Sequence, residues 1–438
     1  MNKPNILYIH SHDTGRYIQP YGHAVPTSNI QELAEEGVMF RQAYCSSPTC
    51  SPSRASMLTG QYPHNNGMLG LSHKGFRLND YRHHIVHTLR AAGYVSALAG
   101  VQHIADTFDI PWKTIGYDMY LGEPPLINAG SHIPPNNAHL AAVEFLDNTP
   151  QQPFFLSIGF VETHRQFPPL PPNRNPGYTL PPALLPDTPQ IREDMARYKT
   201  SAKILDDKIG AVCRALERNG LAENTLVICT TDHGIAFPQM KCNLSGSGIG
   251  VMLIIRGPGG FSGGKVSDSL VSQIDIFPTI CDFIGIPEPD WLQGKSLMPT
   301  IRGTVEEIRH EVYAEINYHV AYEPVRSVRT RRWSYIRRFD RHPHPILPNT
   351  DGSPSKDFLL AHDWGNTPLP EEALYNLIHD PNETHNLMGE PGMEGVIADM
   401  RQRLENWMRE TQDPLLIHGY VPLPPGAFAS DSEGASPS

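Results

Sequence analysis

The sequence lacks the features that define several protein classes. It has six cysteines in 438 residues and no CxxC pair, so neither a disulfide framework nor a zinc finger is indicated. No apolar run approaches membrane-spanning length, and no apolar leader with a cleavage site follows Met1. We therefore expect a cytoplasmic protein that does not contact a membrane. Excess positive charge is also missing, and the net charge of −11 argues against broad binding of nucleic acid.

Strand-like and helix-like segments alternate along most of the chain. The β-rich apolar segments are residues 5–9, 38–44, 94–99, 153–160, 225–230 and 251–255. The helical segments are residues 27–36, 88–92, 193–219 and 275–284. This alternation predicts an α/β fold with a mostly parallel sheet flanked by helices.

The last third of the chain is expected to form a smaller unit. Strand-like residues 312–316 and 325–336 and a helix at 394–409 indicate a C-terminal α+β subdomain. We place this subdomain at residues 301–421, after a larger domain at residues 1–300. Residues 422–438 are rich in proline, serine, glycine and alanine, and we expect a flexible tail there.

Polar side chains that suit a metal or catalytic site follow four of the predicted strands. They are His12 and Asp13, His103, His164, and Asp232 and His233. Open α/β sheets bind their ligands at the carboxyl ends of parallel strands. Each residue taken alone is also compatible with a helix cap or an ordinary buried histidine.

The most unusual segment runs from Cys50 to Gly60. Pro52 suits the first turn of a helix and Gly60 suits its exit, so Cys50 is predicted at a helix N-terminus. Arg54 lies one helical turn further on, on the same face. These residues alone fit either a reactive cysteine beside a fixed cation or a buried structural cysteine.

The segment Cys50-Ser51-Pro52-Ser53-Arg54, with Leu58-Thr59-Gly60, resembles the signature of the formylglycine-dependent sulfatases, in the alkaline-phosphatase-like superfamily. The resemblance covers nearly the whole chain, from the first strand to the motif Leu374-Tyr375-Asn376-Leu377. Within the family, Asn66-Gly67-Met68 and residues 325–330 are closest in pattern to the sulfamidase-like (N-sulfoglucosamine sulfohydrolase-like) branch. The implied fold is the alkaline-phosphatase-like α/β sheet.

The resemblance implies that a formylglycine-generating enzyme oxidises Cys50 to an aldehyde, which is hydrated to a diol. One diol oxygen then attacks sulfur, and the other later expels sulfate. The implied metal ligands are His12, Asp13, Asp232, His233 and the modified Cys50. A divalent cation at this place would lower the pKa of the diol and neutralise sulfate oxygens.

The resemblance also implies catalytic roles for four further side chains. Arg54 matches the residue that holds the formylglycine hydroxyl, and His103 the base that deprotonates the second hydroxyl. His164 and Lys241 match groups that bind sulfate oxygens and assist the leaving group. On the sequence alone, His164 could equally be a loop histidine and Lys241 a surface cation.

Three positions depart from the family pattern. The usual acidic pair is His12-Asp13, and the usual Asp-Asn is Asp232-His233, as in related phosphonate and phosphodiester hydrolases. The lysine that normally stands two residues before His103 is Val101. Two imidazoles beside two aspartates shift metal preference from Ca²⁺ toward Mn²⁺ or Zn²⁺. We expect one divalent ion, with Ca²⁺ or Mn²⁺ ahead of Zn²⁺.

Four residues of the smaller unit are expected to bind substrate. Arg326 and Arg329 belong to an arginine-rich strand segment, and His319 and Glu315 lie nearby in sequence. Arginines can hold an anionic or sugar substrate. The alternative is that this segment is a solvated face of the sheet.

These residues favour a sulfatase that cleaves an O-sulfate or N-sulfate of a small, carbohydrate-like substrate. A phosphonate or phosphodiester hydrolase with the same nucleophile is the second hypothesis, favoured by His233 and Val101. A non-catalytic binder that retains the fold is the third, and it requires an unmodified Cys50 and no metal. A homo-oligomer is compatible with all three.

Overall fold

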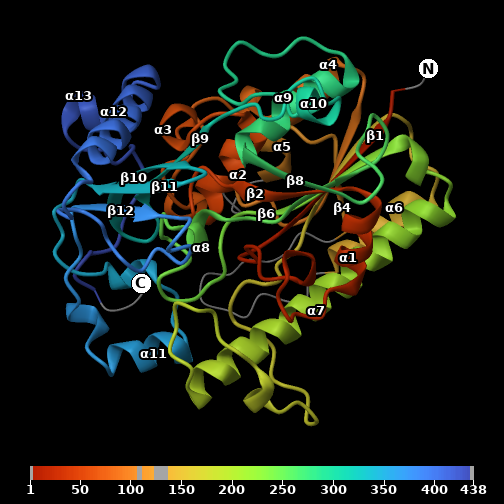
Figure 1. The fold of residues 1–438 in the computed structure, drawn as a ribbon. Helices are drawn as coiled ribbons and strands as arrows, with labels where there is room; N and C mark the ends of the chain where they lie inside the picture. Colours follow the sequence, from red (N-terminus) through yellow and green to blue (C-terminus); the bar gives the residue numbers. More distant parts are fainter. Residues whose placement is uncertain (1–2, 106–110, 123–136, 435–438) are drawn as a thin grey trace.

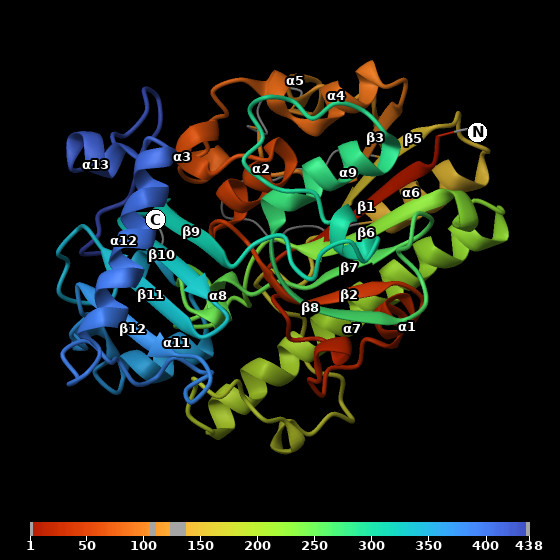
Figure 2. The same cartoon turned by 45° about the horizontal axis from the view of Figure 1, so that its top comes forward.

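The computed structural model describes residues 3–105, 111–122 and 137–434. Its largest element is an eight-stranded sheet with the order β4-β3-β5-β1-β6-β7-β2-β8 (Figures 1 and 2). In chain order the strands are β1 (Asn5–Ser11), β2 (Val38–Tyr44), β3 (Val95–Gly100), β4 (Met119–Leu121), β5 (Phe154–Gly159), β6 (Thr225–Thr231), β7 (Leu253–Arg256) and β8 (Lys265–Ser272). All neighbouring pairs are parallel except those that involve β7. The prediction of a mostly parallel sheet is confirmed.

Helices cover both faces of this sheet, and the two strands at its centre are buried along their whole length. Leu7 and Ile9 of β1 face a core formed with α1 (Ser28–Glu36), α6 (Ala138–Asp147) and α7 (Pro189–Arg218). Ile6 and Tyr8 face the opposite core, which contains α2 (Cys50–Thr59), α4 (Ile85–Ala91) and α9 (Ile276–Ile284) (Figure 2). Burial on both faces explains why residues 6–9 of β1 form a continuous apolar run rather than an alternating pattern.

The start of α7 lies earlier than the sequence indicates. The sequence predicts the helix from residue 193, but Pro189 already occupies its first turn, where the missing N–H removes no helical hydrogen bond. The Thr188 side chain accepts a hydrogen bond from the backbone N–H of Ile191, which caps the helix. The smaller helices are α3 (Pro63–Asn66), α5 (Pro111–Ile115), α8 (Gly246–Ile249), α10 (Met298–Ile301) and α11 (Pro354–Leu360).

A second, antiparallel sheet with the order β12-β11-β10-β9 forms the smaller α+β part. Its strands are β9 (Glu311–Tyr318), β10 (Tyr322–Thr330), β11 (Trp333–Arg338) and β12 (Glu372–Asn376), and the helices beside it are α12 (Glu394–Glu410) and α13 (Pro414–His418) (Figure 1). The expected single strand at 325–336 is wrong, because the chain reverses after Thr330. The Thr330 side chain accepts hydrogen bonds from the backbone N–H groups of Arg332 and Trp333, which closes the turn without glycine.

The described part of the expected flexible tail is attached to the protein. The backbone N–H of Phe428 donates to Lys74 O, and that of Ser430 donates to Val320 O. This part of the tail is therefore tethered, whereas the domain boundaries at residues 300 and 421 stay predictions. None of the helices within the three described ranges has the length and apolar character needed to cross a bilayer.

Candidate active site

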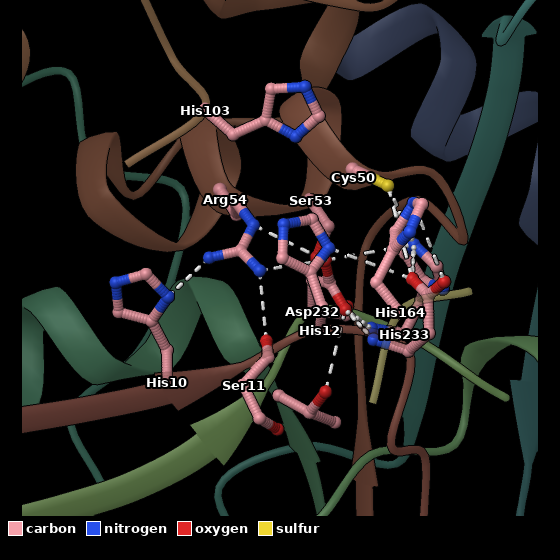
Figure 3. A network of polar contacts seen from close by, with 12 residues as sticks. His10, Ser11, His12, Cys50, Ser53, Arg54, His103, His164, Asp232 and His233 are labelled. Atoms are coloured by element: carbon pink, nitrogen blue, oxygen red, sulfur yellow. Dashed lines mark hydrogen bonds and ion pairs between the residues drawn. The ribbon is translucent and has the colours of Figure 1, made fainter. Parts of the chain in front are cut away.

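Four adjacent parallel strands, in the order β3-β5-β1-β6, bring the predicted polar residues to one edge of the large sheet. His10 pairs with Thr230 and Ser11 with Thr231, so the residues that follow β1 and β6 emerge side by side. The loops after β3 and β5 add two more imidazoles to the same edge. The residues gathered here are Asp13 and, as labelled in Figure 3, His12, His103, His164, Asp232 and His233.

Helix α2 brings Cys50 to this edge. Cys50 is the first residue of the helix, which ends at Gly60 in the left-handed conformation, as the sequence predicts. All ten residues of α2 are buried, and Cys50 Sγ lies 3.4 Å from His233 Nε2 and 4.0 Å from Asp13 Oδ1. Cys50 packs against Leu71 and Val320, but its sulfur also faces an imidazole and a carboxylate, which packing alone would not require.

Arg54 is fixed beside Cys50 by buried acceptors. Its Nε and Nη2 donate to Asp232 Oδ2 at 3.2 and 3.0 Å, and Nη2 also donates to Ser11 O at 2.9 Å. Nη1 donates to Nδ1 of His10 (Figure 3). The guanidinium therefore has one orientation, and its positive charge is held against the carboxylate that faces His12.

The imidazole and carboxylate atoms are arranged to share a cation. His12 Nδ1 lies 3.2 Å from Asp232 Oδ2, yet this buried nitrogen has no aligned hydrogen-bond partner. His233 Nδ1 contacts Gly234 O at 3.0 Å, which leaves Nε2 free to act as a ligand, 3.3 Å from Asp13 Oδ1. Ligand atoms of His12, Asp13, Cys50 and Asp232 all lie within 4.8 Å of one another. This donor set fits a single divalent cation.

The two carboxylates are ionised despite complete burial. Burial alone would raise the pKa of Asp13, but Lys241, His164 and His233 hold it well below its usual range. Burial also acts to raise the pKa of Asp232, and His233 together with Arg54 outweighs it. For Cys50 the balance is opposite, because burial raises the pKa of the thiol well above its usual range and Lys241 does not offset this. With only the charges of the protein around it, Cys50 is therefore a neutral thiol, and a neutral thiol is a weak nucleophile.

Lys241 and His164 both lie at the cluster, where the sequence predicts them. Lys241 Nζ is 3.0 Å from Asp13 Oδ2 and 3.0 Å from Asp351 Oδ2. His164 Nε2 is 4.0 Å from Asp13 Oδ2, and its Nδ1 is held by Arg165 O. Lys241 is therefore a buried cation, not the surface lysine that the sequence also allowed.

His103 also lies at the cluster, and a second histidine supports it. Its ring centroid is 5.5 Å from that of His12, and its Nε2 is 3.4 Å from Nδ1 of His73, with the two rings nearly parallel at 4°. Burial, followed by the charges of His12 and His73, lowers the pKa of His103 well below its usual range. Val101 is buried, so the place of the family's lysine holds an apolar side chain.

The structure corrects the predicted substrate ligands Glu315 and Arg326. All five N–H donors of Arg326 are used inside the protein, by Asp413, Asn317 and the backbone carbonyls of Ile316 and Val325. No donor remains for a substrate. Glu315 is fully buried, and its carboxylate accepts from the backbone N–H and ring of His64.

Arg329 also has a structural partner, whereas His319 lies near the site. Arg329 Nη1 donates to Glu383 Oε1 at 3.0 Å, and its guanidinium lies over the ring of Tyr44. Its substrate role stays a prediction. Burial and then the nearby Lys241 lower the pKa of His319 to about 3. His319 is thus a neutral imidazole beside the cluster, and its substrate role stays a prediction.

Three residues at the site carry no assigned role in the sequence. His10 binds Arg54, His73 contacts His103, and Asp351 contacts Lys241. His10 stands two residues before His12 at the end of the same strand, so the spacing could have indicated it. Asp351 has no such signal, because it lies in an irregular segment far along the chain.

Comparison with known protein families gives two matches. The family described as Sulfatase matches residues 4–286, and the family described as N-sulphoglucosamine sulphohydrolase, C-terminal, matches residues 243–355. Human N-sulphoglucosamine sulphohydrolase is 29% identical over 463 aligned residues, which cover 94% of this chain and 91% of that protein. The delta 4,5-hexuronate-2-O-sulfatase of Bacteroides thetaiotaomicron is 24% identical and covers 94% of this chain and 90% of its own.

Solved structures share the fold at lower identity. A protein solved in complex with its substrate, D-glucosamine-2-N,6-O-disulfate, has a TM-score of 0.72 and 19% identity, covering 94% of this chain and 98% of its own. The phosphonate monoester hydrolase of Agrobacterium radiobacter has a TM-score of 0.70 and 20% identity. The superposition covers 98% of this chain and 100% of that chain. The shared architecture extends over nearly the full length of each chain.

Proposed function

Because the chain belongs to the sulfatase family and is a sulfatase-type hydrolase, we propose that it releases sulfate from a small sulfated carbohydrate. The nucleophile in this proposal is a formylglycine made from Cys50. The observation that carries this proposal is the position of Cys50 at the start of α2, with its sulfur against His233 and Asp13. A formylglycine-generating enzyme acting in the same compartment is the required partner, and we propose the cytoplasm as that compartment.

The residues at the strand ends would hold one divalent cation. Such an ion, when bound by His12, Asp13, Asp232, His233 and residue 50, lowers the pKa of a coordinated hydroxyl and neutralises sulfate oxygens. Two imidazoles beside two carboxylates favour Mn²⁺ over Ca²⁺.

The protein's own side chains divide the remaining work. Arg54 orients Asp232 and keeps a positive charge next to residue 50. His103 is neutral at pH 7 because its pKa is lowered, and a neutral imidazole can accept the proton of a hydroxyl. Lys241 and His164 face the same carboxylate, Asp13, from where they can contact sulfate oxygens and the leaving group.

The relatives support a sulfated amino sugar as substrate. One curated relative is named for N-sulphoglucosamine, and one protein of the same fold was solved with an N- and O-sulfated glucosamine. In a sulfamate and in a sulfate ester alike, sulfur carries three oxygens and one leaving atom in the same arrangement. The leaving atom is nitrogen in the sulfamate and oxygen in the ester.

A phosphonate or phosphodiester hydrolase with the same nucleophile is the second candidate. His233 in place of asparagine and the apolar Val101 favour it, and a phosphonate monoester hydrolase shares the fold. The test compares kcat/KM for a sulfate ester and a phosphonate ester of one alcohol, using enzyme with converted Cys50. We expect the sulfate ester to be preferred, and a large preference for the phosphonate would instead support the second candidate.

A further inference from the structure

Asp351 is the only carboxylate from the second half of the described chain that contacts Lys241. It lies between β11 and α11, and its Oδ2 is 3.0 Å from Lys241 Nζ, the same distance that separates this amine from Asp13 Oδ2. The charges of Lys241, His164, Asp13 and His319 all act on it. Asp351 therefore belongs to the active-site environment, although no catalytic role has been assigned to it.

The segment just before Asp351 is held by hydrogen bonds. Asn349 accepts hydrogen bonds from the backbone N–H groups of Val320 and Ala321 and donates to Glu323, at 2.8 to 3.0 Å. The amine of Lys356 donates to Thr350 O and to Leu347 O, both at 2.8 Å. A side chain carried by such a segment is positioned before any ligand arrives.

A carboxylate is an unexpected group in a site for an anion. Burial acts to raise the pKa of Asp351, but Lys241 and His164 lower it, so the side chain is ionised at pH 7. It would repel a sulfate group, and it can only accept hydrogen bonds. Besides Lys241, the group it can bind favourably on a substrate is a hydrogen-bond donor away from the sulfate.

Space for such a part lies next to the cluster. A cavity of about 310 Å³ is lined by Lys241, Asn349, Thr350 and Trp364, and Asp351 is the residue that follows this lining segment without lining the cavity itself. Its size is at the lower end of the roughly 300–1,000 Å³ of small-ligand pockets, which suits a single sugar ring. Asp351 Oδ2 is buried against Lys241, yet the side chain is 21% exposed, so its remaining surface is accessible.

We propose that Asp351 accepts a hydrogen bond from a hydroxyl or ammonium group on the non-sulfated part of the substrate, and so selects sulfated sugars over aryl sulfates. This inference rests on the proposed function and adds the group that recognises the leaving portion. An aryl sulfate has no donor beside its sulfate, so it makes no hydrogen bond to this carboxylate and gains no binding energy from it.

The rival explanation is that Asp351 only holds Lys241 in place. In that case its loss would weaken the binding of every sulfate group equally, whatever the leaving portion carries. The ratio of two kcat/KM values separates the explanations, because a fault in the sulfate-binding cation affects both substrates and cancels in the ratio.

The experiment measures kcat and KM for N-sulfated glucosamine and for 4-nitrophenyl sulfate, with enzyme whose Cys50 conversion has been verified. The variants are Asp351→Asn and Asp351→Ala, and the control is Asp357→Asn, an exposed aspartate six residues further on. Thermal denaturation followed by circular dichroism checks that each variant folds.

We expect both Asp351 variants to lower the ratio of sugar to aryl kcat/KM by roughly 10- to 100-fold, the loss of one charged hydrogen bond, mainly through a higher KM for the sugar. Asp357→Asn should leave the ratio unchanged. An unchanged ratio in the Asp351 variants, or a wild type that cleaves only the aryl sulfate, would overturn the inference while the proposed function stands. A wild type that cleaves neither sulfate would remove the proposed function, and this inference with it.

Discussion

The sulfur of Cys50 lies 3.4 Å from Nε2 of His233, although 183 residues separate them in the chain. The contact joins the first residue of α2 to the loop that follows the central strand β6. Because His233 Nδ1 is engaged by Gly234 O, Nε2 is the nitrogen presented to residue 50. The contact therefore places the residue expected to be modified among the atoms expected to bind metal.

Metal removal should abolish activity, and the histidines should decide which ion restores it. After dialysis against EDTA, we expect Mn²⁺ to restore sulfate release more fully than Ca²⁺, because His12 and His233 offer imidazole nitrogen. In His12→Asp the site gains a carboxylate, so Ca²⁺ should restore sulfate release more effectively, relative to Mn²⁺, than it does in the wild type. Metal content is measured by elemental analysis beside activity, and a His12→Asp enzyme with unchanged metal preference would argue against His12 as a ligand.

Arg54 should not tolerate even lysine. Lysine keeps the charge, but it cannot make the three contacts that Nε and Nη2 make with Asp232 and Ser11. We expect Arg54→Lys to lower kcat by roughly 100-fold or more, as for loss of a preorganised electrostatic group. Arg82→Lys, at an exposed arginine paired with Asp80, serves as the control and should retain wild-type kcat. Equal kcat values for the two variants would exclude the assigned role.

The buried Arg326–Asp413 pair should make stability depend on pH. Burial acts to raise the pKa of Asp413, but Arg326 outweighs it and lowers the pKa below the ordinary value of about 3.9. Ionised Asp413 therefore stabilises the fold above about pH 4, and this contribution is lost as pH falls through the lowered pKa. Asp413→Asn should reduce the free energy of unfolding at pH 7 by about 3–5 kcal/mol.

Urea denaturation at several pH values tests this prediction. The difference between wild type and Asp413→Asn should be constant near neutrality and shrink below about pH 4. Asp399→Asn removes a half-exposed partner of Arg403 and should change the unfolding free energy by less than about 1 kcal/mol. A difference for Asp413→Asn that grows as pH falls would contradict the assigned sign.

The sequence predicts the catalytic half of the site because that half depends on local order. A strand that ends in His12-Asp13 or Asp232-His233 delivers those side chains to the same edge as its parallel neighbour. The helix that begins at Cys50 is equally local, since proline and glycine mark its start and end.

The residues outside this catalytic half depend on contacts between distant segments. Arg326 alternates along its strand like a solvent-facing residue, and only the presence of Asp413, 87 residues away, shows that it is buried. Asp351 reaches the site through an irregular segment, which hydrophobic periodicity does not describe. The turn after Thr330 was missed for a related reason, because a side-chain hydroxyl closes it instead of glycine or asparagine.

The central claim is that Cys50 is a precursor, and peptide mass spectrometry across position 50 tests it most directly. The protein is produced with a formylglycine-generating enzyme, and Cys50→Ala, made in the same way, is the control. We predict that residue 50 of the wild type is lighter than cysteine by the exchange of H₂S for one oxygen atom and that it reacts with aldehyde reagents. The enzyme that carries this modification should release sulfate. Cys50→Ala should fold but be inactive. An intact thiol at position 50 in fully active enzyme would contradict the account.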